Sequence, residues 1–478
     1  MNSLWVCLHF PDLPLSVFER GDARRRPAVV SSASHRPDVV AANGAARMRG
    51  IVPGLSIAAA LALDAEIRIY LRDERAEAAA LESIALWAVQ WTPTISIEPP
   101  VCVLLEVSGA LNYFGGLGKL LEGIDSGLEA MGFAGTLAVA PTPGAASLFA
   151  RAGEAVILEQ KEGWELRLDA IAVRLLINAQ TLLDSLGGVG VKTLGDVCAL
   201  PRDGAARRFG QRLLDEIDRA RSKLPDPRPL FTVPERYHGQ IELPAPVDQT
   251  EALLFAVRRL VVELSGFLNG HGAGVSRLRC YLVHEDAPPT SVVLGLHCTR
   301  QIEHIMNVLR ERLAREPLPD RVEAIRLVSE EIAPLTAREG DFFPGADKDS
   351  EAGAQLIERL RARLGDAAVH AIACQADHRP ERAWTRIPVS SKKTPSQKKD
   401  KSAGPSRPLW LLSSPRSIGS DPAVAELKLK SGPERIETGW WDGDDVGRDY
   451  FVGCNARGEE LWLYRDRRGG WFVHGVFA

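Results

Sequence analysis

Residues 182–200, LLDSLGGVGVKTLGDVCAL, place two short apolar segments on either side of a turn of the form Gly-hydrophobic-Gly. This is the pattern of a helix-hairpin-helix. Glycine lets the backbone approach a phosphate closely, and the N–H groups of the turn and of a helix N-terminus can bind that phosphate. Such contact is independent of base sequence. The residues predicted to contact DNA in this way are Gly188, Val189, Gly190, Lys192 and Thr193.

The stretch that follows is basic. Residues 201–230 hold eight Lys or Arg side chains against five acids, and they end in LPDPRPL, where the prolines break the helical pattern. We therefore predict a helical domain over 171–228, in which Arg207, Arg208 and Arg212 add to the contact with DNA. The alternative is a small helical domain with a solvated basic face and an ordinary glycine turn.

The flanking regions have different patterns. Residues 1–170 alternate short apolar strands with helical patterns, which predicts an α/β domain. The continuous apolar run VCVLLEVSG (101–109) is typical of a sheet buried on both faces. Residues 229–335 mix alternating strands with two long helices, which predicts a compact α+β domain.

The remaining residues divide by composition. A helical extension is predicted over 346–384, and residues 385–408, rich in Lys, Ser and Pro, are predicted to be a flexible basic linker. Residues 409–478 carry short alternating runs, which predict a small β-rich module. Its tryptophans are numerous enough for a core, and an exposed subset would serve as partner anchors. They include Trp440, Trp441, Trp462 and Trp471.

The length, composition and net charge of the chain limit the number of domains and the kinds of site that we expect. A chain of 478 residues is too long for one core, so we expect roughly three or four domains. We find no apolar run long enough to span a membrane and no signal peptide, and we expect a cytoplasmic protein. Seven scattered cysteines without a CxxC pair argue against a zinc site and a disulfide framework. The net charge of −4 confines any DNA contact to local patches.

The order of these parts resembles the Y-family translesion DNA polymerases. An α/β domain is followed by the helix-hairpin-helix with LGDVCALP and ARRFG, then by RPL and an α+β domain. The resemblance implies a palm and fingers over 1–170, with the fingers at about 31–75, a thumb over 171–228 and a little-finger-like domain over 229–335. Three tail segments resemble ImuB proteins, the polymerase-like subunits of a bacterial mutagenesis cassette: ADHRPERAW (376–384), ERIETGWWDGDDVGRDYFV (434–452) and WFVHGVFA (471–478).

The catalytic carboxylates of the family are not found. In active members they hold two metal ions about 3.5–4 Å apart. The resemblance places His9 at the first position. For the other two, one alignment gives Val101 and Cys102 and another gives Glu98 and Pro99, so neither restores the set. Imidazole and thiol groups are poor ligands for magnesium, which prefers oxygen.

A triphosphate ligand is missing as well. Active members carry a Tyr three residues before an Arg, whereas here Gly44 stands at the Tyr position and Arg47 remains. The resemblance therefore implies a non-catalytic adaptor without metal or other cofactor, which binds primer-template DNA in DNA-damage-induced (SOS) mutagenesis. Two alternatives stay open. One is a residually active low-fidelity polymerase that uses Glu98, Glu106 and Asp12, and the other is a nucleic-acid module without a role in synthesis.

The resemblance also implies protein partners. It places a peptide that binds the sliding clamp after the little finger, at 336–345, with contacts from Glu339, Asp341, Phe342 and Phe343. The alternative there is a loop whose phenylalanines pack on their own domain. A competing match, QTEALLF, begins at Gln249, and we expect its Leu253, Leu254 and Phe255 to be core instead. The other implied partners are an error-prone C-family DNA polymerase and a RecA-like accessory subunit, with no membrane contact.

Overall fold

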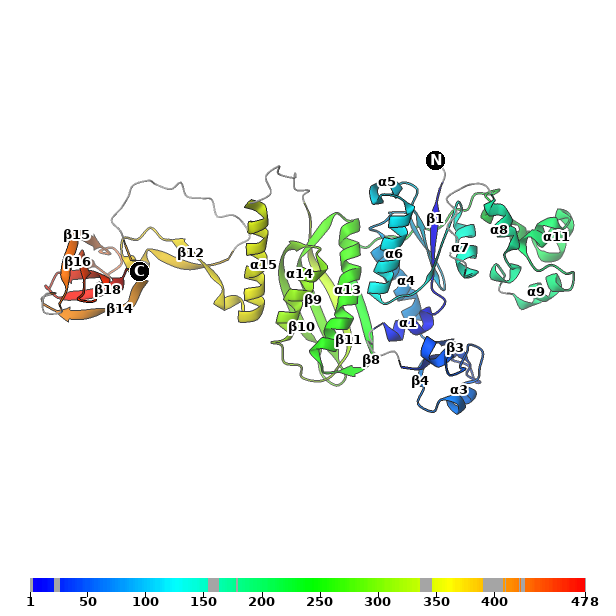
Figure 1. Ribbon diagram of the computed structural model, residues 1–478, viewed down its shortest axis with the longest axis horizontal. Helices are drawn as coiled ribbons and strands as arrows, with labels where there is room; N and C mark the ends of the chain where they lie inside the picture. The colour runs from blue at the N-terminus through cyan, green and yellow to red at the C-terminus, as the bar shows by residue number, and fades with distance from the viewer. Residues whose placement is uncertain are drawn as a thin grey trace. The chain divides into compact units, whose positions relative to one another are not determined.

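The computed structural model describes residues 3–20, 26–153, 163–177, 179–335, 346–389, 407–408, 410–420, 422 and 426–477. The chain divides into two compact units, Met1–Arg363 and Leu364–Ala478. Figure 1 shows the palm, fingers, thumb and little finger in the first unit and a β-rich module in the second. No helix among the described residues is both long and apolar enough to cross a membrane.

The palm is a four-stranded antiparallel sheet in the order β5-β6-β1-β7. Helices α4 and α6 lie on one face and α7 on the other (Figure 1). Alternate residues of β1 follow this division, because Val6 and Leu8 pack with α4 and α6 whereas Cys7 packs with α7. The sheet is therefore buried on both faces, as predicted. The palm elements are β1 (Trp5–His9), α1 (Leu13–Glu19), α4 (Glu74–Ala88), β5 (Ile95–Glu98), β6 (Cys102–Glu106), α5 (Leu111–Phe114), α6 (Leu117–Met131), β7 (Thr136–Ala140) and α7 (Pro143–Arg151).

The fingers form a small three-stranded sheet in the order β3-β2-β4, covered by two short helices. Asn43 begins the first of these helices, and its side chain accepts a hydrogen bond from the Ala46 N–H. This cap places Arg47 at the end of that helix. The elements are β2 (Ala28–Ser31), β3 (Val39–Ala42), α2 (Gly44–Arg47), α3 (Ile57–Leu63) and β4 (Arg68–Leu71).

The thumb is helical throughout its described residues. Its apolar side chains join those of α7 and of the adjacent palm face in one core cluster, so thumb and palm pack directly on each other. The elements are α8 (Trp164–Ala170), the 3₁₀ helix η1 (Val173–Leu175), α9 (Gln180–Gly187), α10 (Leu194–Ala199), α11 (Arg202–Phe209) and α12 (Gln211–Ala220).

The little finger is a four-stranded antiparallel sheet in the order β10-β9-β11-β8, with two helices in its core. A further helix follows it, and Glu358 of that helix accepts a hydrogen bond from His304 Nε2 at 2.6 Å. The elements are β8 (His238–Val247), α13 (Thr250–Gly270), β9 (Ala273–His284), β10 (Thr290–Thr299), α14 (Ile302–Leu313), β11 (Val322–Pro334) and α15 (Ala346–Leu364).

Helix α13 of the little finger packs against α4 of the palm. Gly266 of α13 makes this contact close, since a Cβ there would lie 2.4 Å from Trp87 Cδ1. Within the palm, a Cβ on Gly127 of α6 would lie 2.2 Å from Cζ2 of the same indole. A buried ion pair also crosses the joint, with Arg20 Nη2 3.4 Å from Glu263 Oε2. Palm and little finger therefore share a closely packed interface.

The second unit contains a five-stranded antiparallel sheet in the order β14-β18-β17-β16-β15 and a separate hairpin, β12-β13. Trp462 and Trp471 lie in the core of the sheet, whereas Trp440 and Trp441 are exposed. The predicted α/β and α+β fold with a β-rich C-terminal module is thus confirmed. The elements are the 3₁₀ helices η2 (Asp366–Ala368) and η3 (Pro380–Arg382), and the strands β12 (His370–Cys374), β13 (Trp384–Pro388), β14 (Trp410–Gly419), β15 (Lys428–Thr438), β16 (Val446–Cys454), β17 (Glu460–Asp466) and β18 (Trp471–Val476).

Three predicted boundaries differ from the structure. The thumb includes α8 (Trp164–Ala170), which lies before the predicted start at 171. Helix α15 ends at Leu364, and residues 370–374 pair with 384–388 as strands, so the helical extension predicted over 346–384 is wrong beyond 364. The same pairing places the predicted start of the linker, at 385, inside β13. Gly365, with a φ of +94°, explains why the helix ends where it does.

Candidate active site and nucleic-acid interface

The residues that the resemblance places at the metal-binding positions meet at one end of the palm sheet. Register pairs Glu98 of β5 with Cys102 of β6, and Cys102 with His9 of β1. The structure therefore brings together three of the residues singled out from the sequence, and Val101 lies beside them in the turn between β5 and β6. Glu98 is the one acidic side chain among these four.

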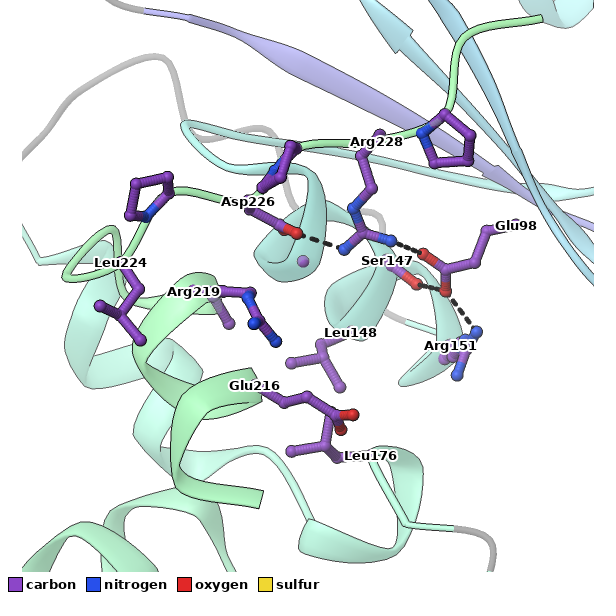
Figure 2. Close-up of a pocket in the computed structure, with 15 residues that line it drawn as sticks. Glu98, Ser147, Leu148, Arg151, Leu176, Glu216, Arg219, Leu224, Asp226 and Arg228 are labelled. Atoms are coloured by element: carbon purple, nitrogen blue, oxygen red, sulfur yellow. Dashed lines mark hydrogen bonds and ion pairs between the residues drawn. The ribbon is translucent and has the colours of Figure 1, made fainter. Parts of the chain in front are cut away.

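Both oxygens of Glu98 are bonded by neighbouring side chains (Figure 2). Ser147 Oγ donates to Oε1 at 2.7 Å, and Arg151 forms an ion pair with the same oxygen. Arg228 Nη1 donates to Oε2 at 2.6 Å, and its Nη2 donates to Asp226 Oδ2 at 2.9 Å. The Glu98 side chain is only 20% exposed. Two cations thus neutralise the carboxylate where a metal ligand would be needed.

Two groups at this end of the sheet, His9 and Cys7, are suited to neutrality, whereas the hydrogen bond with Cys7 lowers the pKa of the Cys102 thiol. Burial, together with the positive charge of Arg151, lowers the pKa of His9, so the imidazole is neutral at neutral pH. Burial raises the pKa of the Cys7 thiol, which lies on the same face of β1. Neither group offers magnesium a charged oxygen.

The two remaining candidate carboxylates lie elsewhere. Glu106 stands opposite Trp5 at the far end of β6, four residues and about 13 Å along the strand from Cys102. Its Oε1 accepts hydrogen bonds from the N–H groups of Leu4 and Ser108. Asp12 forms an exposed ion pair with Arg47. The positions proposed for a residual polymerase therefore do not converge.

The donor set does not fit a two-metal site. In the part of the chain that the structure describes, no three His, Cys, Asp or Glu side chains gather in a way that could hold a metal ion. Glu98 alone supplies oxygen ligands at the expected place, and both of its oxygens already accept hydrogen bonds from cations. We therefore derive no catalytic step through metal.

A pocket of about 730 Å³ opens beside Glu98, between palm and thumb (Figure 2). Helix α7 contributes Ser147 and Arg151, and helix α12 contributes Glu216 and Arg219. The segment that joins thumb to little finger closes the pocket with Arg228. The pocket lining thus mixes charges of both signs with apolar side chains.

Sequence reasoning missed three members of this cluster: Ser147, Arg151 and Arg228. The first two stand four residues apart and so share one face of α7, and that spacing was a usable signal. Arg228 lies in DPRP, where the prolines indicated a break in the helix but not a contact with the palm. Only the tertiary fold brings it to Glu98.

The predicted helix-hairpin-helix is present as α9, a tight turn and α10. Gly190 has a φ of +81°, which glycine adopts readily, and Val189 is 41% exposed at the tip of the turn. Gly188 continues the helical conformation, with a φ of −61°. Thr193 caps α10 by accepting a hydrogen bond from the Asp196 N–H.

The N–H groups of the turn already have acceptors within the protein. Asp196 Oδ2 accepts from the N–H groups of both Lys192 and Thr193, at 2.9 Å each. The N–H of Gly190 donates to the carbonyl of Gly187. The hydrogen bonds to Asp196 lower the pKa of its carboxyl, so a negative charge stands where the sequence predicted a phosphate.

The basic side chains of the thumb are better placed for DNA. Arg207, Arg208 and Arg212 are exposed on α11 and at the start of α12, and Lys192 is exposed beside the turn. Arg212 forms an ion pair with Glu216. Long exposed cations of this kind can contact phosphates without base readout.

Of the two candidate clamp peptides, the structure describes only the competing segment that begins at Gln249. Residues 336–345, with Glu339, Asp341, Phe342 and Phe343, lie outside the described residues. In the competing segment, Leu253 and Leu254 are buried in the core of the little finger. Phe255 is 37% exposed and lies under Arg259, so it is not the core residue that we expected. Helix α13 begins at Thr250, so this segment would have to unwind to bind as an extended peptide.

Comparison with known proteins gives two curated relatives, both described as Protein ImuB, from Caulobacter vibrioides strains NA1000 / CB15N and ATCC 19089 / CIP 103742 / CB 15. Each is 24% identical over 468 residues, which cover 90% of this chain and 100% of the relative. No family model matches.

Similar solved structures include an insertion ternary complex of Dbh DNA polymerase and DinB from Sulfolobus solfataricus. Both are 18% identical and cover 68% of this chain and 98% of their own, with TM-scores of 0.41 and 0.40. In sequence, the chain is similar to ImuB over nine-tenths of its length, which confirms the resemblance predicted from its motifs.

Proposed function

We propose that this chain is a non-catalytic, Y-family polymerase-like adaptor in DNA-damage-induced mutagenesis. It binds primer-template DNA through its thumb, docks on the sliding clamp and recruits an error-prone C-family polymerase, together with a RecA-like accessory subunit, in the cytoplasm. The observation that carries the proposal is the state of Glu98. This acidic side chain, which one alignment places at a metal position, is held by Arg151, Arg228 and Ser147.

The separation of the other carboxylates supports the same conclusion. Glu98 of β5 stands opposite Cys102 at one end of β6 and Glu106 stands at the other end, so the two acids cannot bridge ions about 3.5–4 Å apart. Arg47 pairs with Asp12 and no longer stands beside a tyrosine. Similarity to ImuB over nine-tenths of the chain supports a role beside a polymerase.

Primer extension tests the absence of catalysis. The purified chain, free of other polymerases, should not extend a primer with either magnesium or manganese. Incorporation that Glu98→Ala or Glu106→Ala abolishes would show a residually active polymerase and overturn the proposal. Incorporation that both variants retain would indicate a contaminating enzyme.

Clamp docking is tested at the peptide proposed from the sequence. Phe342→Ala combined with Phe343→Ala should abolish binding to the sliding clamp, while Leu356→Ala, an exposed apolar residue on α15, should leave binding unchanged. Losing the Gln of the usual peptide removes a polar contact, so wild-type affinity should be on the order of micromolar. If the double variant still binds, the segment from Gln249 to Phe255 becomes the candidate.

A further inference from the structure

Two adjacent tryptophans project from the C-terminal module. Trp440 is 79% exposed and Trp441 58%, in the loop that joins β15 to β16. Their rings lie 5.6 Å apart in an edge-to-face arrangement. Exposed neighbouring indoles are costly to leave in water, since burying an aromatic side chain stabilises a complex substantially.

The loop that carries them is held by a buried arginine. Arg379 is 2% exposed, and its guanidinium donates to both oxygens of Asp442, at 3.0 and 2.6 Å. It also donates to the Asp444 carbonyl at 3.1 Å and to both oxygens of Asp377. Arg382 adds ion pairs to Asp442 and Asp444. The loop is therefore held by hydrogen bonds and ion pairs to the residues that directly follow the two tryptophans.

The backbone of the loop leaves little room for another conformation. Gly439 has a φ of +90°, and a Cβ there would lie 2.2 Å from the Asp444 carbonyl oxygen. The tryptophans follow directly after this residue, so they are presented in a fixed position. A preorganised aromatic pair loses little conformational entropy on binding, which is the property of an interface hot spot.

Charge decides between two kinds of partner. The ion-pair network attached to the loop contains five carboxylates and only three guanidiniums: Asp377, Glu437, Asp442, Asp444 and Asp445 against Arg379, Arg382 and Arg467. Exposed indoles can stack on the bases of single-stranded DNA, but its phosphates would meet this net negative charge. A protein pocket that is apolar inside and basic at its rim fits both the rings and the charge.

We propose that Trp440 and Trp441 form a docking element for such a pocket on a protein partner. The inference rests on the proposed function, which supplies the two partners to be tested: the RecA-like accessory subunit and the C-family polymerase. It goes further because it names the residues and the chemistry of the contact. Because the partner rim is basic, affinity should fall as salt concentration rises.

The test uses the full chain and each purified partner in a binding titration. Trp440→Ala combined with Trp441→Ala should raise the Kd for one partner by about 30-fold or more, as truncation of hot-spot residues does. Trp410→Ala is the matched control, because Trp410 is 72% exposed on β14 of the same unit, and its Kd should stay at the wild-type value. Arg379→Gln, which removes the support of the loop, should weaken binding even with both tryptophans present.

The other possible outcomes of this titration contradict either the docking element, the recruitment function or the kind of partner. If wild type binds a partner and the double variant binds it equally well, the docking element is wrong while the adaptor function stands. If wild type binds neither partner, the recruitment function itself fails and takes this inference with it. If the double variant instead loses binding to an oligo-dT strand, or loses self-association in sedimentation, the occupant is DNA or a second copy and the proposal is overturned.

Discussion

Glu98 shows how an acidic residue at the end of a buried sheet can be held by cations of the same chain. Its carboxylate joins three elements of the first unit. Glu98 ends β5, its partners Ser147 and Arg151 belong to α7, and Arg228 belongs to the segment that leaves the thumb. Buried and partly buried cations require a counter-charge, since an unpaired charge away from water is unfavourable. The presence of a carboxylate at Glu98 is therefore explained by its structural role as a counter-charge, without any catalytic step.

Glu98→Gln should accordingly destabilise the first unit. The variant leaves Arg151 without its carboxylate partner and Arg228 with Asp226 alone, and both arginines are less than one-quarter exposed, so we expect a loss of about 1.5–3 kcal/mol. Thermal unfolding should show a midpoint lower by several degrees. Glu122→Gln, on the exposed surface of α6, serves as the control and should leave the midpoint unchanged. Equal midpoints for the two variants would mean that the ion-pair cluster contributes nothing.

Asp196 is the second residue whose role can be tested by removing only its charge. Asp196 lies in the first turn of α10, where one of its oxygens accepts both hydrogen bonds, and the amide oxygen of Asn has two lone pairs, so Asp196→Asn should keep the hydrogen bonds from Lys192 and Thr193. Removal of a negative charge beside the turn should then raise affinity for duplex DNA by about 5-fold at low salt, corresponding to roughly 1 kcal/mol. Fluorescence anisotropy measures this. An unchanged Kd would show that DNA does not approach the turn.

At the scale of elements, the strands of the palm and the turn of the thumb could be predicted, because each is specified by residues that are adjacent in the sequence. The apolar run at 101–109 and the Gly-hydrophobic-Gly turn at 188–190 each specify their own backbone. The pairing of residues 370–374 with 384–388 could not be predicted, since two short strands with little apolar alternation resemble a loop. The contact between α13 and α4 was equally hidden, because each helix alone has ordinary amphipathic spacing and only the glycines of α13 hint at close approach.

The packing of α13 and α6 around Trp87 of α4 has a specific test. Gly127→Ala and Gly266→Ala each place a methyl group against Trp87, closer than van der Waals contact allows, so each should destabilise the first unit by about 1–3 kcal/mol. Gly118→Ala, in the same helix as Gly127, has no atom within 4 Å of the added carbon and should be neutral or slightly stabilising. Chemical denaturation compares the three variants. A neutral Gly266→Ala would mean that the little finger does not pack on the palm.

The thumb helices give a prediction about DNA. Arg207→Ala combined with Arg208→Ala should weaken binding to all DNA sequences alike. The slope of log K against log salt should become shallower by about 2, because each arginine that neutralises a phosphate contributes about one to that slope. Arg468→Ala, exposed in a turn of the second unit, is the control. Weakening confined to particular sequences would contradict a phosphate-based interface. An unchanged slope would move the DNA interface away from α11.

At the scale of the whole molecule, the boundary between the units differs from the one suggested by composition. The Lys-rich stretch suggested that a tail begins near 409, but the second unit begins at Leu364. Composition could not show this, because the connection depends on Arg379, which lies before the stretch and bonds to Asp442, which lies after it. A separation of 63 residues along the chain gives no local signal.

This arrangement makes limited proteolysis informative. Trypsin should cut first within 392–401, where five lysines stand in a sequence with nothing apolar to bury. The two fragments should nevertheless stay together during native gel filtration and separate only under denaturing conditions, because Arg379 remains on one fragment and Asp442 on the other.

The association of the two fragments should depend on pH. Arg379 lowers the pKa of Asp442 to about 2, below its ordinary value near 3.9, so the ion pair stabilises the complex fully at pH values above 3.9. Its contribution is lost as the pH falls toward 2, so the fragments should separate in that range and not at pH 5. Arg379→Gln should release the C-terminal fragment at neutral pH, whereas Arg468→Ala should not. Wild-type fragments that separate at pH 7 would show that the Arg379 network does not connect the two sides of the cut.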